Sequence, residues 1–184
     1  MVYRFKLVSD EVSNFSREIE IDSENTFLQL RNTILESVGY TKDELDSFFL
    51  CDDDWEKQEE VSLEEMAITS SDRDQWLMES TTISELIEDE GQRMIFQFDY
   101  EGDRGFFMEL KEILPSRHLA EPLCTIKRGK APEQFVEIDD VERRAADVKA
   151  AQTPDMDALD IESIGDESFD DEDIDSGFDI MNMD

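Results

Sequence analysis

The stretch that most constrains the fold covers residues 93–113, where two alternating apolar runs flank a polar turn. The first run places Met94, Phe96, Phe98 and Tyr100 on one parity, and the second places Phe106, Met108 and Leu110 on one parity. The turn between them reads Glu-Gly-Asp-Arg, at residues 101–104. Aromatic-rich alternation bounded by turn residues is typical of a β-hairpin with one buried face. We therefore predict a hairpin that supplies much of the core.

Further elements surround this hairpin in the sequence. Residues 2–9 and 15–22 alternate in the same way and predict an N-terminal hairpin. A helix is predicted next, because Phe27, Leu30, Ile34, Leu35 and Val38 have the spacing of one buried helical stripe. Gly39 is suited to end that helix. Short apolar runs at residues 47–51 and 123–127 predict additional strands.

Together these elements predict an α+β domain over residues 1–135. We expect a mixed sheet of about five strands with one main helix across a face, in ββαβ(α)ββ order and loosely ubiquitin-like. Residues 136–152 carry Ile138, Val141, Ala145 and Val148 at helical spacing, which predicts an amphipathic helix. Residues 154–184 contain no Lys or Arg and few apolar residues, so residues 153–184 are predicted to be a disordered acidic tail.

The charge restricts the classes of partner. Seventeen basic residues against fifty acidic ones give a formal charge of −33, which repels nucleic acid and anionic membranes. If the charge has a role in binding, we therefore expect a basic protein partner. The other interpretation is that the charge serves only to keep the protein soluble. No apolar run is long enough to span a bilayer. The sequence has no secretory-type start, and its two cysteines lie outside any paired motif, so a cytoplasmic location is expected.

Three segments resemble the Ri-plasmid open-reading-frame-three-like family, a group of small bacterial domains also met on mobile elements. They are FLQLRNTILESVGYTKDELDSFFL (27–50), FQFDYEGDRGFFMEL (96–110) and Ala131-Pro132-Glu133. The family's Trp and His after its Gly-Asp pair are replaced around residues 105–107, and its usual His before a Leu is Glu44. The resemblance implies an α+β fold with a mixed sheet and a helix across one face, and it implies no activity.

Candidate site residues cluster in the central turn. Asp99 and Asp103 flank it, and Arg104 could pair with either carboxylate. This pattern would suit a degenerate catalytic site, but we favour carboxylates that cap the turn's own amides. Arg128, Lys130 and Glu133, in a turn-like basic stretch, are further candidates for partner binding.

No metal, cofactor or catalytic residue is predicted. Asp52-Asp53-Asp54 could bind a cation, but three consecutive carboxylates point in different directions and favour a solvated turn. Cys51 could act as a nucleophile with His118, but a cysteine in an apolar run is more often a packing residue. Asp171, Asp173 and Asp175 resemble the start of a calcium loop that lacks the required Gly and Glu.

Two functional hypotheses follow. In the first, the chain is a non-enzymatic interaction module, and apolar side chains of the tail lie between carboxylates and anchor it to a partner protein. These anchors are Phe169, Ile174, Phe178 and Ile180. The tail could instead dock within the same chain, on Arg128 and Lys130. In the second, the carboxylates imitate phosphates and bind basic nucleic-acid-binding proteins. An enzyme is a minor third hypothesis.

Overall fold

The expected central hairpin is present. Strands β6 (Arg93–Asp99) and β7 (Arg104–Leu114) pair antiparallel, and their shared core face carries Met94, Phe96, Phe106 and Met108. This computed structural model describes residues 1–65 and 75–136. The N-terminal hairpin, β1 (Val2–Val8) and β2 (Ser16–Asp22), is also as predicted.

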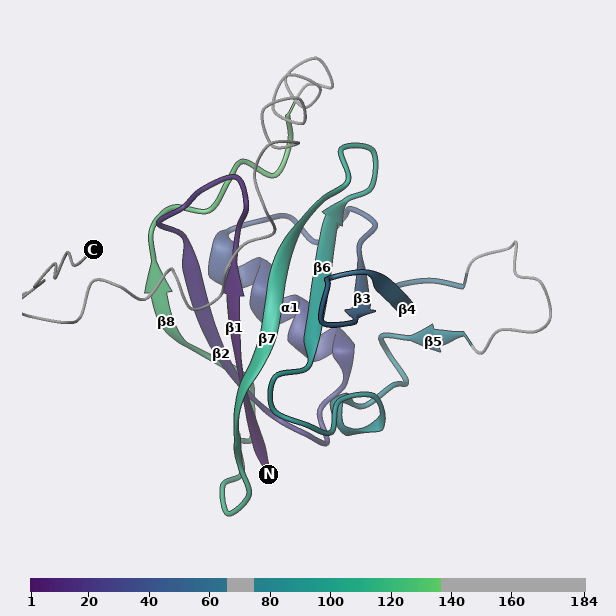
Figure 1. The fold of residues 1–184 in the computed structure, drawn as a ribbon, viewed down its shortest axis with the longest axis vertical. Helices are drawn as coiled ribbons and strands as arrows, with labels where there is room; N and C mark the ends of the chain where they lie inside the picture. The colour runs from purple at the N-terminus through teal and green to yellow at the C-terminus, as the bar shows by residue number, and fades with distance from the viewer. Residues whose placement is uncertain (66–74, 137–184) are drawn as a thin grey trace, which may run out of the picture.

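All strands within residues 1–65 and 75–136 join one mixed sheet (Figure 1). Its order is β5-β4-β3-β6-β7-β1-β2-β8, and every pairing is antiparallel except the parallel pair β4–β5. The remaining elements are the helix α1 (Phe27–Val38), β3 (Ser47–Cys51), β4 (Lys57–Ser62), β5 (Trp76–Leu77), the 3-10 helix η1 (Ile83–Glu85) and β8 (Leu123–Arg128). The predicted α+β class with a mixed sheet is therefore confirmed.

The strand count corrects the expectation of about five strands, because the sheet has eight. β4 begins Lys-Gln-Glu-Glu and has no apolar alternation to reveal it, and β5 has only two residues. The loosely ubiquitin-like arrangement is not confirmed. The helix predicted over residues 136–152 lies outside the described residues except for Val136, and the predicted tail lies outside them entirely.

α1 lies across one face of the sheet and seals the main core (Figure 1). Thr26 begins the helix in a capping box with Gln29, which satisfies backbone donors that the first turn leaves without partners. Gly39 ends it at φ +76°, a conformation that glycine adopts without steric cost. The buried stripe is Phe27, Leu30, Ile34 and Leu35, as predicted, and it packs on the alternate residues Tyr3, Phe5 and Leu7 of β1.

The opposite face of the sheet is covered by its own side chains. Arg4 pairs with Glu20 and Glu112. Arg93 pairs with Glu109 and stacks on Trp55. Beneath these charged groups, Val8, Trp55 and Ile95 form a second, smaller apolar cluster. Several charged side chains of this face are therefore paired with one another within the protein.

In residues 1–65 and 75–136, no helix has both the length and the apolar character to cross a membrane.

Candidate functional site

The segment that follows β8 crosses one corner of the molecule and is held there by hydrogen bonds. We call residues 131–136 the strap. The Tyr40 hydroxyl donates to the carbonyl oxygen of Pro132, at 2.5 Å. The Thr41 amide donates to Oε1 of Gln134, at 2.8 Å, and Gln134 Nε2 donates back to the Thr41 carbonyl, at 3.2 Å. Pro132 is buried, so the strap is an integral part of the folded body.

Arg104 holds the strap from the other side. Its Nη2 donates to the carbonyl of Glu133 at 2.6 Å, and its Nη1 to the carbonyl of Gln134 at 3.1 Å. The same guanidinium makes a two-pronged ion pair with Glu11, at 2.9 and 3.1 Å, and lies 5.0 Å from the centre of the Phe98 ring. Arg104 is 7% exposed, so its charge is used inside the protein.

The two predicted carboxylates of the turn have different partners. Asp99 Oδ1 accepts from the Gly102 amide at 3.0 Å, as the capping interpretation expects, and Oδ2 lies 3.4 Å from Arg104 Nη1. Asp103 turns away from Arg104. Its Oδ1 accepts from Lys57 Nζ at 3.0 Å and from Gln97 Nε2 at 2.9 Å. The structure therefore brings Asp99, but not Asp103, into contact with Arg104.

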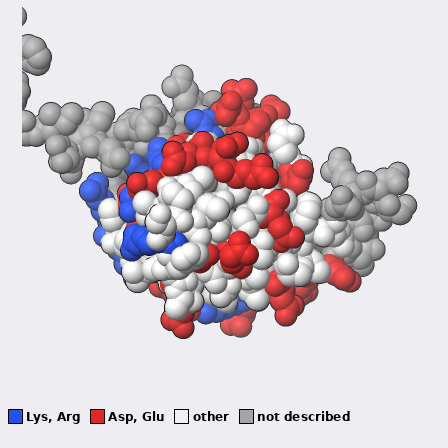
Figure 2. Space-filling view, turned by 90° about the horizontal axis from the view of Figure 1, so that it is seen from below, with Lys and Arg blue, Asp and Glu red and all other residues white. Residues whose placement is uncertain are grey.

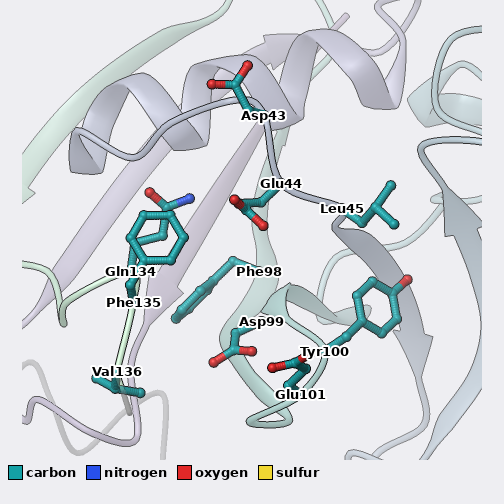
Figure 3. Close-up of a pocket in the computed structure, with 10 residues that line it drawn as sticks. All are labelled: Asp43, Glu44, Leu45, Phe98, Asp99, Tyr100, Glu101, Gln134, Phe135 and Val136. Carbon is teal, nitrogen blue, oxygen red and sulfur yellow. The ribbon is translucent and has the colours of Figure 1, made fainter.

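An open pocket of about 560 Å³ lies beside the strap (Figure 3). Three segments line it: residues 43–45 before β3, residues 98–101 at the end of β6, and residues 134–136 of the strap. A buried ion pair fixes the first segment, since Arg31 Nε lies 2.6 Å from Asp46 and Arg31 Nη2 donates to the carbonyls of Lys42 and Glu44. All three walls are thus held by specific side-chain contacts.

The pocket gathers exposed apolar side chains. Among the described residues, five large hydrophobic side chains are exposed, and three of them line this pocket: Leu45 at 59%, Tyr100 at 38% and Phe135 at 60%. The buried ring of Phe98 also lines it. Exposure of apolar groups to water costs free energy. Their concentration in one concave region therefore indicates a binding surface.

Carboxylates surround these apolar groups. Glu44, Asp99 and Glu101 lie around the opening, while the Asp43 carboxylate points away from the other three (Figure 3). Within the described part of the chain, the carboxylates of Glu44 and Glu101 make no hydrogen bond or ion pair. Figure 2 views the molecule from below in the orientation of Figure 1, and on that face acidic side chains are spread widely while basic side chains gather toward one side. The pocket is therefore suited to a cationic ligand.

Tyr100 is held as a hydrogen-bond donor at the pocket wall. Its hydroxyl donates to Glu60 Oε1 at 2.8 Å and also contacts Ser47 Oγ. Burial, together with the hydrogen bond to and the charge of Glu60, raises the pKa of Tyr100 to about 12. The ring is consequently neutral at physiological pH and fixed in orientation.

The other predicted partner-binding residues lie elsewhere. Arg128 does not line the pocket; its backbone carbonyl accepts from Arg17 Nη1 at 2.6 Å. Lys130 is exposed outside the pocket, and Glu133 contributes its carbonyl to Arg104. Phe169, Ile174 and Phe178 fall outside the described residues.

Cys51 and His118 do not form a catalytic pair. Cys51 ends β3, whereas His118 Nδ1 lies 3.0 Å from Asp22 at the end of β2. β6, β7 and β1 lie between these two strands, so four inter-strand spacings separate β3 from β2 by roughly 19 Å. Burial raises the pKa of Cys51 to about 11, which opposes formation of a nucleophilic thiolate.

The triplet Asp52-Asp53-Asp54 forms a turn. Asp52 Oδ1 accepts from the amides of Asp54 and Glu56, both at 2.9 Å, which is the solvated-turn interpretation of this triplet. Across residues 1–65 and 75–136, no group of three or more His, Cys, Asp or Glu residues is placed to hold a metal ion.

The sequence pattern missed the pocket's apolar residues. Tyr100 shares the parity of the buried Phe96 and Phe98, but the β6–β7 register shifts between Gln97 and Asp99, and Tyr100 lies in the turn. Leu45 and Phe135 lie outside any periodic element. The signal available for Phe135 was its position just after Ala131-Pro132-Glu133.

Comparison with known proteins identifies the family. The family described as plasmid pRiA4b ORF-3-like protein matches residues 2–177, and the chain belongs to it. The fold of this chain is similar to that in the crystal structure of a protein of unknown function from Methanosarcina mazei Go1, with a TM-score of 0.57 and 18% sequence identity. The match covers 81% of this chain and 82% of the Methanosarcina mazei chain. No match was found among curated proteins.

Two of the three segments that resemble the family line the pocket, and the third lies directly before its strap residues. Segment 27–50 supplies Tyr40 and residues 43–45, and segment 96–110 supplies Arg104 and residues 98–101. Ala131-Pro132-Glu133 forms the fixed part of the strap. Stretches that are far apart in the sequence therefore converge on one site.

Proposed function

We propose that this chain is a cytoplasmic, non-enzymatic protein-interaction module. The observation that carries the proposal is the pocket beside the strap, where carboxylates without partners among the described residues surround exposed Leu45, Tyr100 and Phe135. Concave apolar surface with a few convergent polar groups is typical of binding sites. A formal charge of −33 favours a cationic partner.

The chemistry of the pocket indicates a basic segment of a partner protein. An arginine guanidinium can pair with a carboxylate while its plane stacks on an aromatic ring. Glu44 and Glu101 offer the first interaction, and Tyr100 and Phe135 offer the second. Leu45 can accept an apolar neighbour of the basic residue. The preferred ligand is therefore a peptide in which Arg or Lys alternates with aliphatic residues.

The groups that could have supported catalysis have structural contacts. Asp99 caps its own turn, Arg104 is buried against Glu11 and the strap, and burial raises the pKa of Cys51. These contacts support a binding role over an enzymatic one. The anchors Phe169, Ile174 and Phe178 remain part of the proposal as a second contact with the partner.

Binding of a fluorescently labelled Arg- and Leu-rich peptide to the full chain tests the proposal. We expect Phe135→Ala, which keeps the charge, to weaken binding about tenfold or more. The double substitution Glu44→Gln and Glu101→Gln should weaken it too. The matched control is Glu64→Gln with Glu65→Gln, which removes the same charge from exposed residues outside the pocket.

The phosphate-mimic hypothesis predicts a different outcome. Under this hypothesis, the Glu44/Glu101 double variant and the Glu64/Glu65 double variant weaken peptide binding equally, and Phe135→Ala has no effect. Moderate salt also abolishes binding, because the net charge of the protein is then what binds the ligand. That result would replace the pocket with the acidic surface as the functional element.

A further inference from the structure

We propose that the cation bound in this pocket is a quaternary ammonium group, as carried by a trimethylated lysine of the partner protein. The inference rests on the proposed function and deepens it, because it names the chemical state of the basic side chain that the pocket accepts. Two properties of the pocket support it: the exposed rings of Tyr100 and Phe135, and the small number of lining groups that can accept a further hydrogen bond.

Most polar groups that line the pocket have partners within the protein. Asp99 uses both carboxylate oxygens, one on the Gly102 amide and one on Arg104. The side chain of Gln134 exchanges two hydrogen bonds with the backbone of Thr41, and the Gln134 carbonyl accepts from Arg104. These groups hold the walls of the pocket and offer little further hydrogen-bonding capacity to a ligand.

The remaining negative charge of the pocket lies at its opening. Glu44 and Glu101 are exposed, and within the described part of the chain their carboxylates make no hydrogen bond or ion pair. Apolar atoms of Leu45, Tyr100 and Phe135 line the pocket beside them (Figure 3). A bound cation is therefore attracted by carboxylates at the opening while apolar surface contacts much of it.

The aromatic rings of the pocket are suited to a cation. One face of the buried Phe98 ring is already occupied by the Arg104 guanidinium, which lies 5.0 Å from the ring centre. The rings left for a ligand are those of Tyr100 and Phe135, at 38% and 60% exposure. The face of an aromatic ring attracts a cation through its quadrupole, and quaternary ammonium groups are recognised in this way.

Hydrogen-bond accounting distinguishes this ligand from an unmodified basic residue. A lysine ammonium has three N–H donors and an arginine guanidinium has five, and each donor that loses water without gaining an acceptor opposes binding. A trimethylammonium group has no N–H donor, so it loses no such bond on entering the pocket. Its charge remains, and its methyl groups contact Leu45 and the two exposed rings. The pocket therefore favours the methylated form.

The first test compares three labelled Leu-rich peptides that differ at one position in binding to the full chain. That position carries lysine, trimethyllysine, or a neutral isostere in which carbon replaces the quaternary nitrogen. We expect the trimethyllysine peptide to bind about tenfold more tightly than either of the others. Tighter binding of the lysine peptide would overturn the inference and retain the proposed basic partner. Equal binding of the isostere would also overturn it, because apolar contact alone would then explain the affinity.

A substitution in the protein tests the contact with the ring. Phe135→Leu removes the ring and keeps an apolar side chain, so we expect weaker binding of the trimethyllysine peptide and unchanged binding of the isostere. The control is Leu123→Ala, which alters an exposed hydrophobic residue outside the pocket and should change neither affinity. Equal losses for both peptides in Phe135→Leu would contradict a cation–π contact.

Choline chloride separates the two sources of this ligand chemistry. We expect choline to displace the trimethyllysine peptide only at a large molar excess, because free choline lacks the neighbouring residues of the peptide. Binding of choline without binding of any peptide would reject the proposed protein partner and retain the quaternary ammonium site. Binding of the lysine peptide with no effect of choline would reject the quaternary ammonium site and retain the partner.

Discussion

The hydroxyl of Tyr40 donates a hydrogen bond to the carbonyl oxygen of Pro132, 92 residues further along the chain. The Tyr40 ring also packs against Phe98 and Phe106. Burial raises the pKa of Tyr40, so the hydroxyl remains a donor at physiological pH. This one side chain therefore connects the end of α1, the central hairpin and the strap, and it fixes a wall of the pocket.

Replacing Tyr40 with Phe should lower both stability and peptide binding. The substitution keeps the ring and removes one partly buried hydrogen bond, which costs about 0.5–1.5 kcal/mol in the free energy of unfolding. Urea denaturation measures that cost, and the labelled peptide measures binding. Tyr3→Phe is the control, because it removes a hydrogen bond to the Ile87 carbonyl without touching the strap. Unchanged binding in Tyr40→Phe would separate the strap from the pocket's function.

Replacing Asp46 with Ala should be among the most destabilising single changes. Arg31 and Asp46 are each 3% exposed and pair at 2.6 Å. Removing one partner leaves a buried charge without compensation, which costs about 3–5 kcal/mol. The measurement is the denaturation midpoint in urea. The control, Asp43→Ala, alters an exposed carboxylate and should change stability by less than about 0.5 kcal/mol. Similar midpoints for the two variants would contradict this role of Arg31.

Asp22 should contribute stability that acid removes. Burial opposes its ionisation, but hydrogen bonds from the Glu24 amide, His118 and the Leu119 amide outweigh this effect and lower the pKa of Asp22. A lowered folded-state pKa stabilises the protein above the unfolded value of about 3.9, and this stabilisation is lost as pH falls through the folded value. The difference in unfolding free energy between the unmodified chain and Asp22→Asn should therefore shrink on acidification. A constant difference would show that the pKa is not lowered.

The Cys51 thiol should react slowly in the native protein. Burial, opposed by the charge of Lys57, raises the pKa of Cys51 to about 11. At mildly alkaline pH its thiolate fraction is then roughly 100-fold below that of a free cysteine. Alkylation of a Cys124→Ser variant isolates this thiol, and the same variant in urea gives the reference rate. Equal rates in the folded and unfolded protein would revive Cys51 as a reactive residue.

The sequence predicted those elements in which periodicity and burial coincide. The hairpin of β6 and β7 and the stripe of α1 follow from alternation and helical spacing, because each buries one face against the same core. β4 escaped prediction because its first four residues are polar or charged and leave no apolar period. The pairing of β4 with β3 depends on tertiary contacts, which the local sequence pattern does not encode.

The candidate site was predicted in part. The turn carboxylate Asp99 and its neighbour Arg104 were identified, and they do meet. The partner Glu11 was missed, because its position 93 residues before Arg104 gives no local signal. The exposed apolar walls were also missed, since an exposed Phe135 and a buried Phe98 look alike in a sequence.

The position of β1 has a consequence for folding on the ribosome. β1 is synthesised before the other strands of this sheet, yet it lies between β2 and β7, and Val2 pairs with Leu114. One edge of the N-terminal hairpin therefore stays unpaired until β7 has been synthesised. Long-range strand pairing of this kind slows folding, and an open apolar edge favours aggregation during the wait. For this protein, the risk of misfolding is set by the order of synthesis as much as by final stability.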